Sequence, residues 1–539
     1  MFSELLNNLI TDTTGSVLHH FQAELWLSGA IVLMLLVRLF SLDRFVPGFF
    51  VALVGALLAG WASMGQFESL MELTTDLSVP FFGGMLRQDL FSAFFRVFLS
   101  LFLVLTIALT VLTGIPDSED APDFYSLLLG ATIGMMIMAS ANSLLMLFLG
   151  VEMASVPSYV MVGFLKGRKA SSEAALKYVV YGAGSAGVML YGISLVAGVL
   201  GTGDLSLLGD RLRIVAEGGV AGLDDPEVRV AALGTMLVMV GLAFKLSLVP
   251  FHFWCPDAFE GASAEVAGFL SVASKAGAFA LLVRFCAGMS GVEQTAQLMS
   301  AFGIGMGVIA IVTTTFGNLA AYAQENLKRL LAYSTIAHAG YMLMGVAAMM
   351  VMLNSEQAAG LGQEINYSIG GLLYYLAVYL FMNLGAFAVV ALVRNYTFSE
   401  ELDSFKGLIS QSPALAIAML VCVFSLIGMP PFGGFFAKLM IFAAVYKSAQ
   451  IHWAMYVVLA FGGLNTVFSL FYYARILKAM FLQERPADAR PVSPPASEGS
   501  YVLVLAAMVL LLGVLPTLVQ GLASIANEAG NAVLSVVNR

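Results

Sequence analysis

The sequence predicts an all-α protein that crosses a membrane about fourteen times. Three observations predict this fold class: hydrophobic residues make up 60% of the 539 residues, charged residues make up only 11%, and long apolar runs recur along the whole chain. Soluble globular proteins contain about 25% charged residues, whereas a membrane-spanning helix needs about 20 mostly apolar residues. The formal net charge of -9, without a basic stripe, argues against nucleic-acid binding.

Clusters of Gly, Pro and charged residues separate the apolar runs and give the order of the predicted spans. The spans begin near Ala23, Pro47, Leu90, Phe124, Ser143, Ala174, Val228, Ala264, Ala301, Lys328, Gly370, Pro413, Trp453 and Tyr501. No Lys or Arg precedes the first span, so we expect no cleavable signal peptide. The first span itself is then expected to direct insertion.

The distribution of basic residues predicts the orientation. With the spans placed as above, loops after odd-numbered spans hold eleven Lys and Arg residues, including Arg44, and loops after even-numbered spans hold six. Loops rich in Lys and Arg face the cytoplasm. Both termini are therefore expected to face outward.

The sequence predicts no metal, nucleotide or redox cofactor in this chain. Its three cysteines and five histidines show no metal-ligand spacing. The stretch "GAGSAG" at Gly182–Gly187 matches a dinucleotide-binding pattern, but it lies inside an apolar span with no preceding strand. Small residues packing one helix against another are the more natural interpretation.

Ionisable residues lie inside the predicted spans, where a charge costs at least about 2.5–3.5 kcal/mol of insertion free energy. They are Glu152, Lys177, Lys245, His252, Lys275, His338 and Lys438. Lys245 and Lys275 have long apolar sequence on both sides, so their side chains are poorly placed to reach the membrane interface. Passive roles stay open for Lys177 as an interface residue, His338 as a neutral core histidine and Glu152 as a static ion-pair partner.

Proline interrupts two of the predicted spans. Pro250 follows Lys245 in "FKLSLVPFHF", and a Pro-Pro pair precedes Lys438 in "GMPPFGGFFAKLMIF". Proline removes a helical hydrogen bond, and broken helices at membrane depth line cavities and mark transport sites. A Ser-Leu pair precedes proline in both spans, five spans apart. This match predicts two repeats of five spans, and because five is odd, the second repeat is inverted.

These residues together predict proton transfer. Burial favours the neutral form of a lysine, and a nearby carboxylate favours the charged form. A carboxylate about 5 Å away contributes about 3 kcal/mol at an effective dielectric constant of about 20. We therefore expect Glu152 to control a proton on Lys245, with Pro250 opening the helix to water. Lys275 is expected near the middle of the membrane, where water and His338 connect the two halves of the path.

Four longer stretches carry a resemblance to a known family. They read "GLAFKLSLVPFHFWCPDAFEGA", "FLSVASKAGAFA", "ENLKRLLAYSTIAHAGYMLMG" and "GMPPFGGFFAKLMIF". In this order they resemble the antiporter-like subunit N of bacterial respiratory complex I, NADH–quinone oxidoreductase, over about Leu90–Phe481. The resemblance implies fourteen core helices with two inverted five-helix repeats, and proton translocation driven by quinone chemistry in other subunits.

The resemblance also implies roles for individual residues. By position, Glu152 matches the glutamate of the family's fifth helix, Lys177 the lysine of the sixth, Lys245 the lysine of the broken seventh with His252 seven residues on, Lys275 the lysine of the eighth and Lys438 that of the broken twelfth. One departure is "GASAEV" at Gly261–Val266, where the family usually has a turn that contains proline. The connection between spans seven and eight, and the role of Glu265, are therefore not given by the resemblance.

The resemblance divides the chain and implies its surroundings. Residues 1–123 hold spans 1–3, residues 124–290 the first repeat, residues 298–482 the second repeat, and residues 483–539 a linker with span 14. The implied enzyme is a proton-translocating NADH:quinone oxidoreductase, whose flavin, iron–sulfur clusters and quinone lie in partner subunits. Other membrane-arm subunits, including a neighbouring antiporter-like subunit, and the lipid bilayer are the implied partners. The implied location is the bacterial inner membrane, with both termini on the periplasmic face.

Two other functions compete with this one. A subunit of a multisubunit cation/proton antiporter would have related repeats but no link to redox chemistry. A structural membrane anchor would have no transport function at all. The buried lysines argue against an anchor. Lysine at position 438, with a short C-terminal region after span 14, favours subunit N. Copurification with flavin and iron–sulfur subunits would separate the first two functions.

Overall fold

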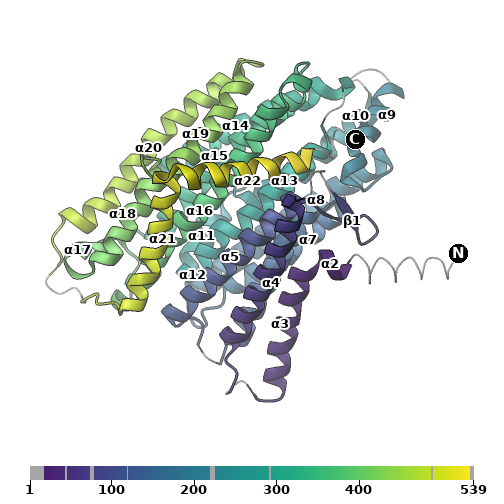
Figure 1. Cartoon of the computed structure of the whole chain (residues 1–539). Coiled ribbons are helices and arrows are strands. Elements are labelled where there is room, and N and C mark those ends of the chain that lie inside the picture. The colour runs from purple at the N-terminus through teal and green to yellow at the C-terminus, as the bar shows by residue number, and fades with distance from the viewer. Residues whose placement is uncertain are drawn as a thin grey trace.

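The computed structural model describes residues 17–534, apart from residues 43–44, 73–77, 118, 219–224, 291–292 and 487–489. Arg44 and both chain ends, which enter the prediction of orientation, lie outside the described residues. Helices make up most of the described chain (Figure 1).

Thirteen helices in the described part of the chain are long and apolar enough to cross a membrane. They are α3 (Gln22–Leu39), α4 (Gly48–Glu72), α5 (Leu90–Thr113), α6 (Ala121–Ser140), α7 (Leu144–Val162), α8 (Lys169–Leu200), α10 (Pro226–Leu246), the continuous helix Ala264–Gly288, α14 (Ala296–Ala321), α15 (Leu327–Leu353), α16 (Gly362–Thr397), α20 (Ala454–Leu482) and α21 (Ala496–Val514). The predicted twelfth span is a pair of shorter helices, α18 (Pro413–Ile427) and α19 (Gly433–Ala449). The predicted all-α membrane fold is therefore confirmed.

The remaining elements are short or lie across the spans. They are α2 (Leu18–His20), the strands β1 (Val79–Phe81) and β2 (Leu86–Gln88), η2 (Leu205–Leu207), α9 (Leu208–Gly218), α11 (Trp254–Gly261), η5 (Glu293–Thr295), η6 (Ala358–Gly360), η7 (Leu402–Phe405), α17 (Leu408–Gln411) and α22 (Pro516–Leu534). The two strands pair antiparallel, with Val79 opposite Gln88. Helix α22, which no apolar run in the sequence predicted, runs across the bundle over α16 and α5 (Figure 1).

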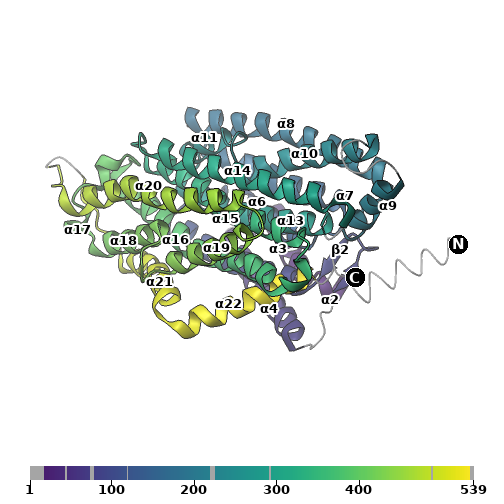
Figure 2. The same ribbon diagram turned by 90° about the horizontal axis from the view of Figure 1, so that it is seen from above.

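The centre of the molecule is formed by three helices: α15, α16 and the continuous helix. The continuous helix consists of α12 (Ala264–Phe269), the π-helix η4 (Leu270–Ser274) and α13 (Lys275–Gly288). Every residue from Ala264 to Ala287 is buried. Seen from above, α17, α18 and α20 lie at one end of the molecule and α7, α9 and α10 at the other (Figure 2). The central helices are thus largely enclosed by the rest of the chain.

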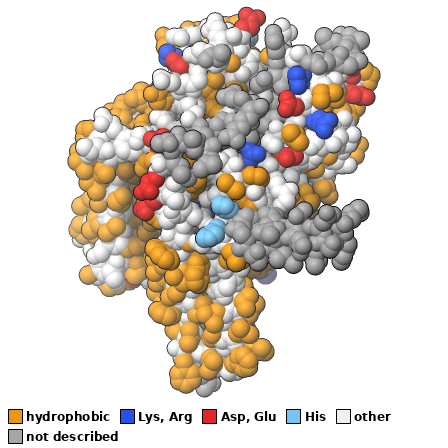
Figure 3. Space-filling view, turned by 45° about the vertical axis from the view of Figure 1, so that its right-hand side comes forward, with side chains coloured by type: hydrophobic (Ala, Val, Ile, Leu, Met, Phe, Trp, Pro, Cys, Tyr) orange, Lys and Arg blue, Asp and Glu red, His pale blue; other side chains and the backbone are white. Residues whose placement is uncertain are grey.

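The outer surface is apolar where the chain would meet lipid. Hydrophobic side chains cover the projecting end formed by α3 and α4 (Figure 3), and Leu39, Phe45 and Trp61 are among the most exposed of them. An apolar surface of this extent is stable against lipid or another membrane subunit rather than against water.

Both broken spans interrupt the helix in the same way. Ser247 follows α10 with φ 58°, and Gly428 follows α18 with φ 88°, so each helix ends at a left-handed residue that stands three positions before a proline. The Ser-Leu pairs that suggested the match do not correspond, because Ser247 follows its helix whereas Ser425 lies inside α18. Backbone conformation, rather than residue identity, relates the two breaks.

Candidate functional site

Lys245 lies at the C-terminal end of α10, and its ammonium group donates to a hydroxyl. Its side chain is 1% exposed, and Nζ lies 3.0 Å from Oγ of Ser155 on α7. The Ser155 hydroxyl in turn donates to the carbonyl of Val151. Glu152 lies one turn away on the same helix. It interacts electrostatically with Lys245 without forming an ion pair within 4 Å among the described side chains.

The break after α10 supplies the partner of the next lysine. Lys275 is 1% exposed near the middle of the 25-residue continuous helix, and its Nζ donates to Oγ of Ser247 at 3.2 Å. The indole of Trp254 donates to the carbonyl of Phe244 at 2.9 Å, and the same carbonyl accepts from the backbone N–H of Ser247 at 3.0 Å. Ser247 therefore lies between the segments that carry Lys245 and Lys275.

His338 on α15 is hydrogen-bonded on both ring nitrogens. Nδ1 lies 2.7 Å from the hydroxyl of Tyr375 on α16, and Nε2 lies 3.3 Å from the hydroxyl of Tyr473 on α20. The Tyr473 hydroxyl also bonds Ser334. A neutral imidazole has one donor and one acceptor nitrogen, and each phenol can donate or accept. This chain of groups could exchange protons by switching donor and acceptor roles.

Lys438 lies in the helix that follows the second break. Its side chain is 4% exposed, Nζ donates to the carbonyl of Ile427 at 2.8 Å, and the ammonium lies 4.6 Å from the ring centroid of Tyr341. A Cβ at Gly428 would approach the Lys438 side chain to 2.9 Å. Glycine at this position therefore both permits the left-handed backbone and leaves room for the lysine.

Lys177 lies apart from the other lysines, at the edge of the molecule. Its side chain is 41% exposed and forms ion pairs of 2.8 Å with Glu173 and Asp257. Arg329 pairs with Asp257 at 2.7 Å and with Glu260 at 2.5 Å. Asp257 belongs to α11, between two spans. Burial by itself raises the pKa of its carboxyl, but hydrogen bonds from Lys177 and Arg329 lower this pKa below its ordinary value.

His252 and Glu152 do not join the hydrogen-bonded groups above. His252 is buried against the rings of Phe253 and Phe316, with centroid separations of 4.3 and 4.4 Å. Its Nδ1 has no hydrogen-bond partner among the described residues. Glu152 is only partly buried on α7. The structure thus brings Lys245 and Lys275 together around one break, and places His338 and Lys438 beyond them.

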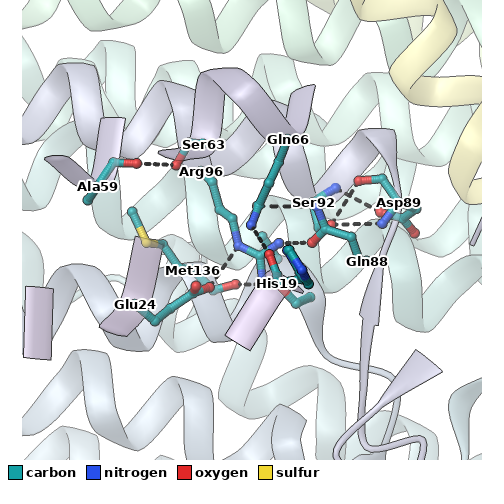
Figure 4. Close-up of polar contacts among 12 residues, drawn as sticks. His19, Glu24, Ala59, Ser63, Gln66, Gln88, Asp89, Ser92, Arg96 and Met136 are labelled. Carbon is teal, nitrogen blue, oxygen red and sulfur yellow. Dashed lines mark hydrogen bonds and ion pairs between the residues drawn. The ribbon is translucent and has the colours of Figure 1, made fainter. Parts of the chain in front are cut away.

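A second buried charged group ties the N-terminal helices to the rest of the chain (Figure 4). Arg96 on α5 donates to Glu24 on α3 at 2.8 Å, to Gln88, and to a serine hydroxyl on α6 at 3.1 Å. Both members of the Arg96–Glu24 pair are fully buried. Beside this pair, Arg284 on α13 donates to Asp89 at 2.6 Å. We call these two ion pairs the arginine cluster.

The uncharged hydrogen-bond partners of these groups were not predicted from the sequence. The sequence spacing could have pointed to Ser155, because this residue lies three positions after Glu152 and therefore on the same helix face. It could also have pointed to Ser247, since this residue stands just before a proline break. It could not have pointed to Tyr473, because this residue comes from a helix 135 residues away from His338. In the described part of the chain, no group of three or more His, Cys, Asp or Glu could hold a metal ion.

The comparison with known families first gives the class of the chain. The family model described as "NADH:quinone oxidoreductase/Mrp antiporter, TM" matches residues 141–468, a range that includes both breaks and Lys245, Lys275 and Lys438. "NADH-quinone oxidoreductase subunit N" of Anaeromyxobacter sp. (strain Fw109-5) is 38% identical, over 88% of this chain and 89% of its own length. The chain belongs to the NADH-quinone oxidoreductase subunit N family.

Chains of solved membrane complexes share the fold. A chain of respiratory complex I from Thermus thermophilus with bound aureothin is 28% identical, with a TM-score of 0.71 over 93% of this chain and 98% of that one. A chain of the Mrp complex from Dietzia sp. DQ12-45-1b has a TM-score of 0.77 over 95% and 99% of the two chains. At 20% identity, the second likeness is one of fold alone.

Proposed function

We propose that this chain is a proton-translocating membrane-arm subunit of an NADH–quinone oxidoreductase, and that Lys245, Lys275 and Lys438 carry the protons. One observation carries the proposal. Each of these buried ammonium groups is hydrogen-bonded to a neutral oxygen, and none is paired with a carboxylate within 4 Å in the described chain. An ammonium group with a neutral partner can lose its proton without leaving an unpaired carboxylate behind.

The proposed path runs from Lys245 to Lys275 and on to His338 and Lys438. Ser247 connects the first two lysines, as described above. The ring of Tyr341 lies 6.0 Å from that of His338 and 4.6 Å from the Lys438 ammonium, so it adjoins both groups. Water molecules beside these hydroxyls complete the path in this proposal.

Glu152, Lys177 and His252 take supporting roles in this proposal. Glu152 stabilises the protonated form of Lys245 through its charge. Its partly exposed position on α7 would let a neighbouring antiporter-like subunit change that charge or its distance. Lys177 fixes α8 to α11 through Asp257, close to the first break. His252 lies beside the first break, where its ring packs against that of Phe316 on α14.

We further propose the division into spans 1–3, two inverted repeats at residues 124–290 and 298–482, and a terminal segment. The matching backbone at Ser247 and Gly428 supports two related breaks. The basic loops support an orientation with both termini on the periplasmic face of the inner membrane. Redox chemistry, with flavin, iron–sulfur clusters and quinone, is assigned to partner subunits of the same complex.

A subunit of a multisubunit cation/proton antiporter is the second candidate, because this chain matches the fold of the Mrp chain as well as it matches that of the complex I chain. The two functions differ in what accompanies the chain through purification. Flavin and iron–sulfur subunits that copurify with it would support the first function, and their absence from an intact purified complex would support the second.

Lys275→Met tests the proposed path. Methionine keeps the length and apolar character of the side chain but cannot hold a proton. In membrane vesicles that contain the assembled complex, NADH-driven acidification should fall about tenfold or more. Electron transfer from NADH to an artificial acceptor should persist. Normal acidification by the assembled variant would exclude Lys275 from the path.

A further inference from the structure

Glu265 is a fully buried carboxyl group that the path above does not use. Its side chain is 0% exposed, and neither carboxylate oxygen has a hydrogen-bond partner among the described residues. It lies in the first turn of α12, directly after the junction with α11. An unpaired carboxylate is expensive to bury. A bound water molecule beside the carboxyl group would lower that cost.

Basic and acidic groups connect this position to the surface. Nζ of Lys328 donates to the carbonyl of Ala262 at 2.5 Å, three residues before Glu265, and interacts electrostatically with the Glu265 carboxyl. Lys328 also pairs with Glu400 at 2.9 Å, and Arg394 lies 3.5 Å from the same carboxylate. Glu400 and Arg394 are partly exposed. Lys328 thus lies between the partly exposed pair of Glu400 and Arg394 and the buried Glu265.

Unpaired polar groups continue from Glu265 toward Lys275 along the same helix. The two residues are ten positions apart, or about 15 Å at the rise of an α-helix. Between them, Oγ of Ser271 accepts from the amide of Asn383 on α16 at 2.5 Å. Oδ1 of Asn383 and Oγ of Ser274 are buried without hydrogen-bond partners in the described chain. Buried polar atoms of this kind are usual positions for bound water, and Ser271 and Ser274 lie in the π-helix η4, a form enriched at functional sites.

We infer that Glu265 is a proton-binding residue that loads Lys275 from the Lys328 end of the central helices. In this step the O–H bond of the Glu265 carboxyl breaks and an N–H bond forms on the neutral Lys275 amine, through water beside Ser271 and Ser274. The Glu265 carboxylate then regains a proton from the aqueous phase at the Lys328 end of the helix. No electron moves in either step. The inference rests on the proposed function, because it requires Lys275 to carry protons.

The test compares four variants in the whole complex: Glu265→Gln, Glu265→Asp, Lys275→Met and the control Glu364→Gln. Glu364 lies in the first turn of α16 and pairs with Lys447 at 3.6 Å, so the control removes a carboxylate that has no part in the path. NADH-driven acidification of vesicles is measured at matched complex levels, together with the reaction-induced infrared difference spectrum in H₂O and D₂O. Glu265→Gln should slow acidification about tenfold, Glu265→Asp should restore part of it, and Glu364→Gln should leave it unchanged.

The infrared spectrum separates proton binding from a structural role. The intact complex should show a carboxylic-acid band that moves in D₂O, is absent in Glu265→Gln and is shifted in Glu265→Asp. If Glu265→Gln does not assemble, the spectrum of Glu265→Asp decides: an unshifted band overturns the inference. Normal acidification by Glu265→Gln also overturns it. When Lys275→Met is inactive in the same experiment, such a result removes Glu265 alone, whereas normal acidification by Lys275→Met removes the proposed path itself.

Discussion

The arginine cluster and the three path lysines are two buried charged regions that are built in opposite ways. In the arginine cluster, Arg96 and Arg284 each contact a buried carboxylate, at 2.8 and 2.6 Å. In the path, Lys245, Lys275 and Lys438 contact two serine hydroxyls and one backbone carbonyl. Both regions remove charge from water inside an apolar protein, so burial alone does not distinguish them.

The difference between the regions lies in what each charge can do. A guanidinium hardly ever loses its proton, and it forms several directed hydrogen bonds at once. The Arg96–Glu24 pair therefore fixes α3 to α5 as a permanent contact. A lysine ammonium releases its proton much more readily when buried, and a neutral partner stays stable after the proton leaves. The type of hydrogen-bond partner, rather than burial, therefore distinguishes the three path lysines, whose protons can leave, from the two arginines.

The largest expected effect comes from replacing Lys245, which can release a proton, by arginine, which cannot, or by methionine, which carries no charge. Lys245→Arg keeps a permanent positive charge beside Ser155 but does not release a proton. Lys245→Met removes both charge and proton. If a proton must leave this position, each variant should lower NADH-driven acidification about tenfold or more. Reduction of an artificial acceptor by NADH should persist in both.

The arginine variant decides between a mobile and a fixed charge at this position. Acidification restored by Lys245→Arg but not by Lys245→Met would mean that the lysine acts only through its charge, as the arginine cluster does. The distinction between the two regions would then be lost. The assay requires equal amounts of assembled complex in both membranes, measured by acceptor reduction.

The second prediction concerns stability and applies to the arginine cluster. Arg96→Met leaves the Glu24 carboxylate buried without its partner, which should destabilise the subunit by about 3–5 kcal/mol. The double variant Glu24→Leu with Arg96→Met removes both charges and should recover most of that loss. Thermal unfolding of the purified complex measures both effects.

The protons pumped per NADH should be unchanged in any Arg96→Met complex that assembles. A lowered ratio at normal assembly would show that the arginine cluster takes part in transport. The double variant is the matched control, because it makes the same arginine substitution without stranding a charge.

A smaller effect is expected from Glu152→Gln, which keeps the side-chain shape and removes the charge. Lys245 should then bind its proton less tightly, because it loses an opposite charge nearby. Acidification should slow severalfold, and the loss should grow as the pH rises. A normal rate across roughly pH 6–8 would show that Glu152 does not control Lys245.

Much of the fold followed from the sequence, because membrane spans are set by length and hydrophobicity. The fourteen predicted spans have counterparts in the structure, and proline marked both breaks. Helix α22 was missed, since its apolar residues cover one face only and give no continuous run. The strands β1 and β2 have three residues each, too few for an alternating pattern to be recognised.

The charged residues of the candidate site could be predicted from the sequence, but their hydrogen-bond partners could not. A lysine in an apolar run is conspicuous, so Lys245, Lys275 and Lys438 could be named from the sequence. The contact between His338 and Tyr473 depends on how α15 and α20 pack, which no local pattern encodes. Glu152 was expected to act on Lys245 through its charge, and the two groups do interact electrostatically, but the Ser155 hydroxyl that contacts the ammonium could not be foreseen.

The smallest expected effect is that of Ser155→Ala, which removes the hydroxyl partner of Lys245 and leaves both charges in place. A hydrogen bond to a charged group contributes about 1.5–3 kcal/mol. A water molecule in the space left by the hydroxyl should replace part of that hydrogen-bond energy. Acidification should therefore slow about two- to fivefold, well short of the loss expected for Lys245→Met. Ser155→Thr retains a hydroxyl and is the matched control, which should pump close to the normal rate. If Ser155→Ala stops acidification as completely as Lys245→Met, the hydroxyl itself conducts the proton and is no mere neutral partner. The path would then differ from the arginine cluster through a serine that conducts protons as well as through the lysines that carry them.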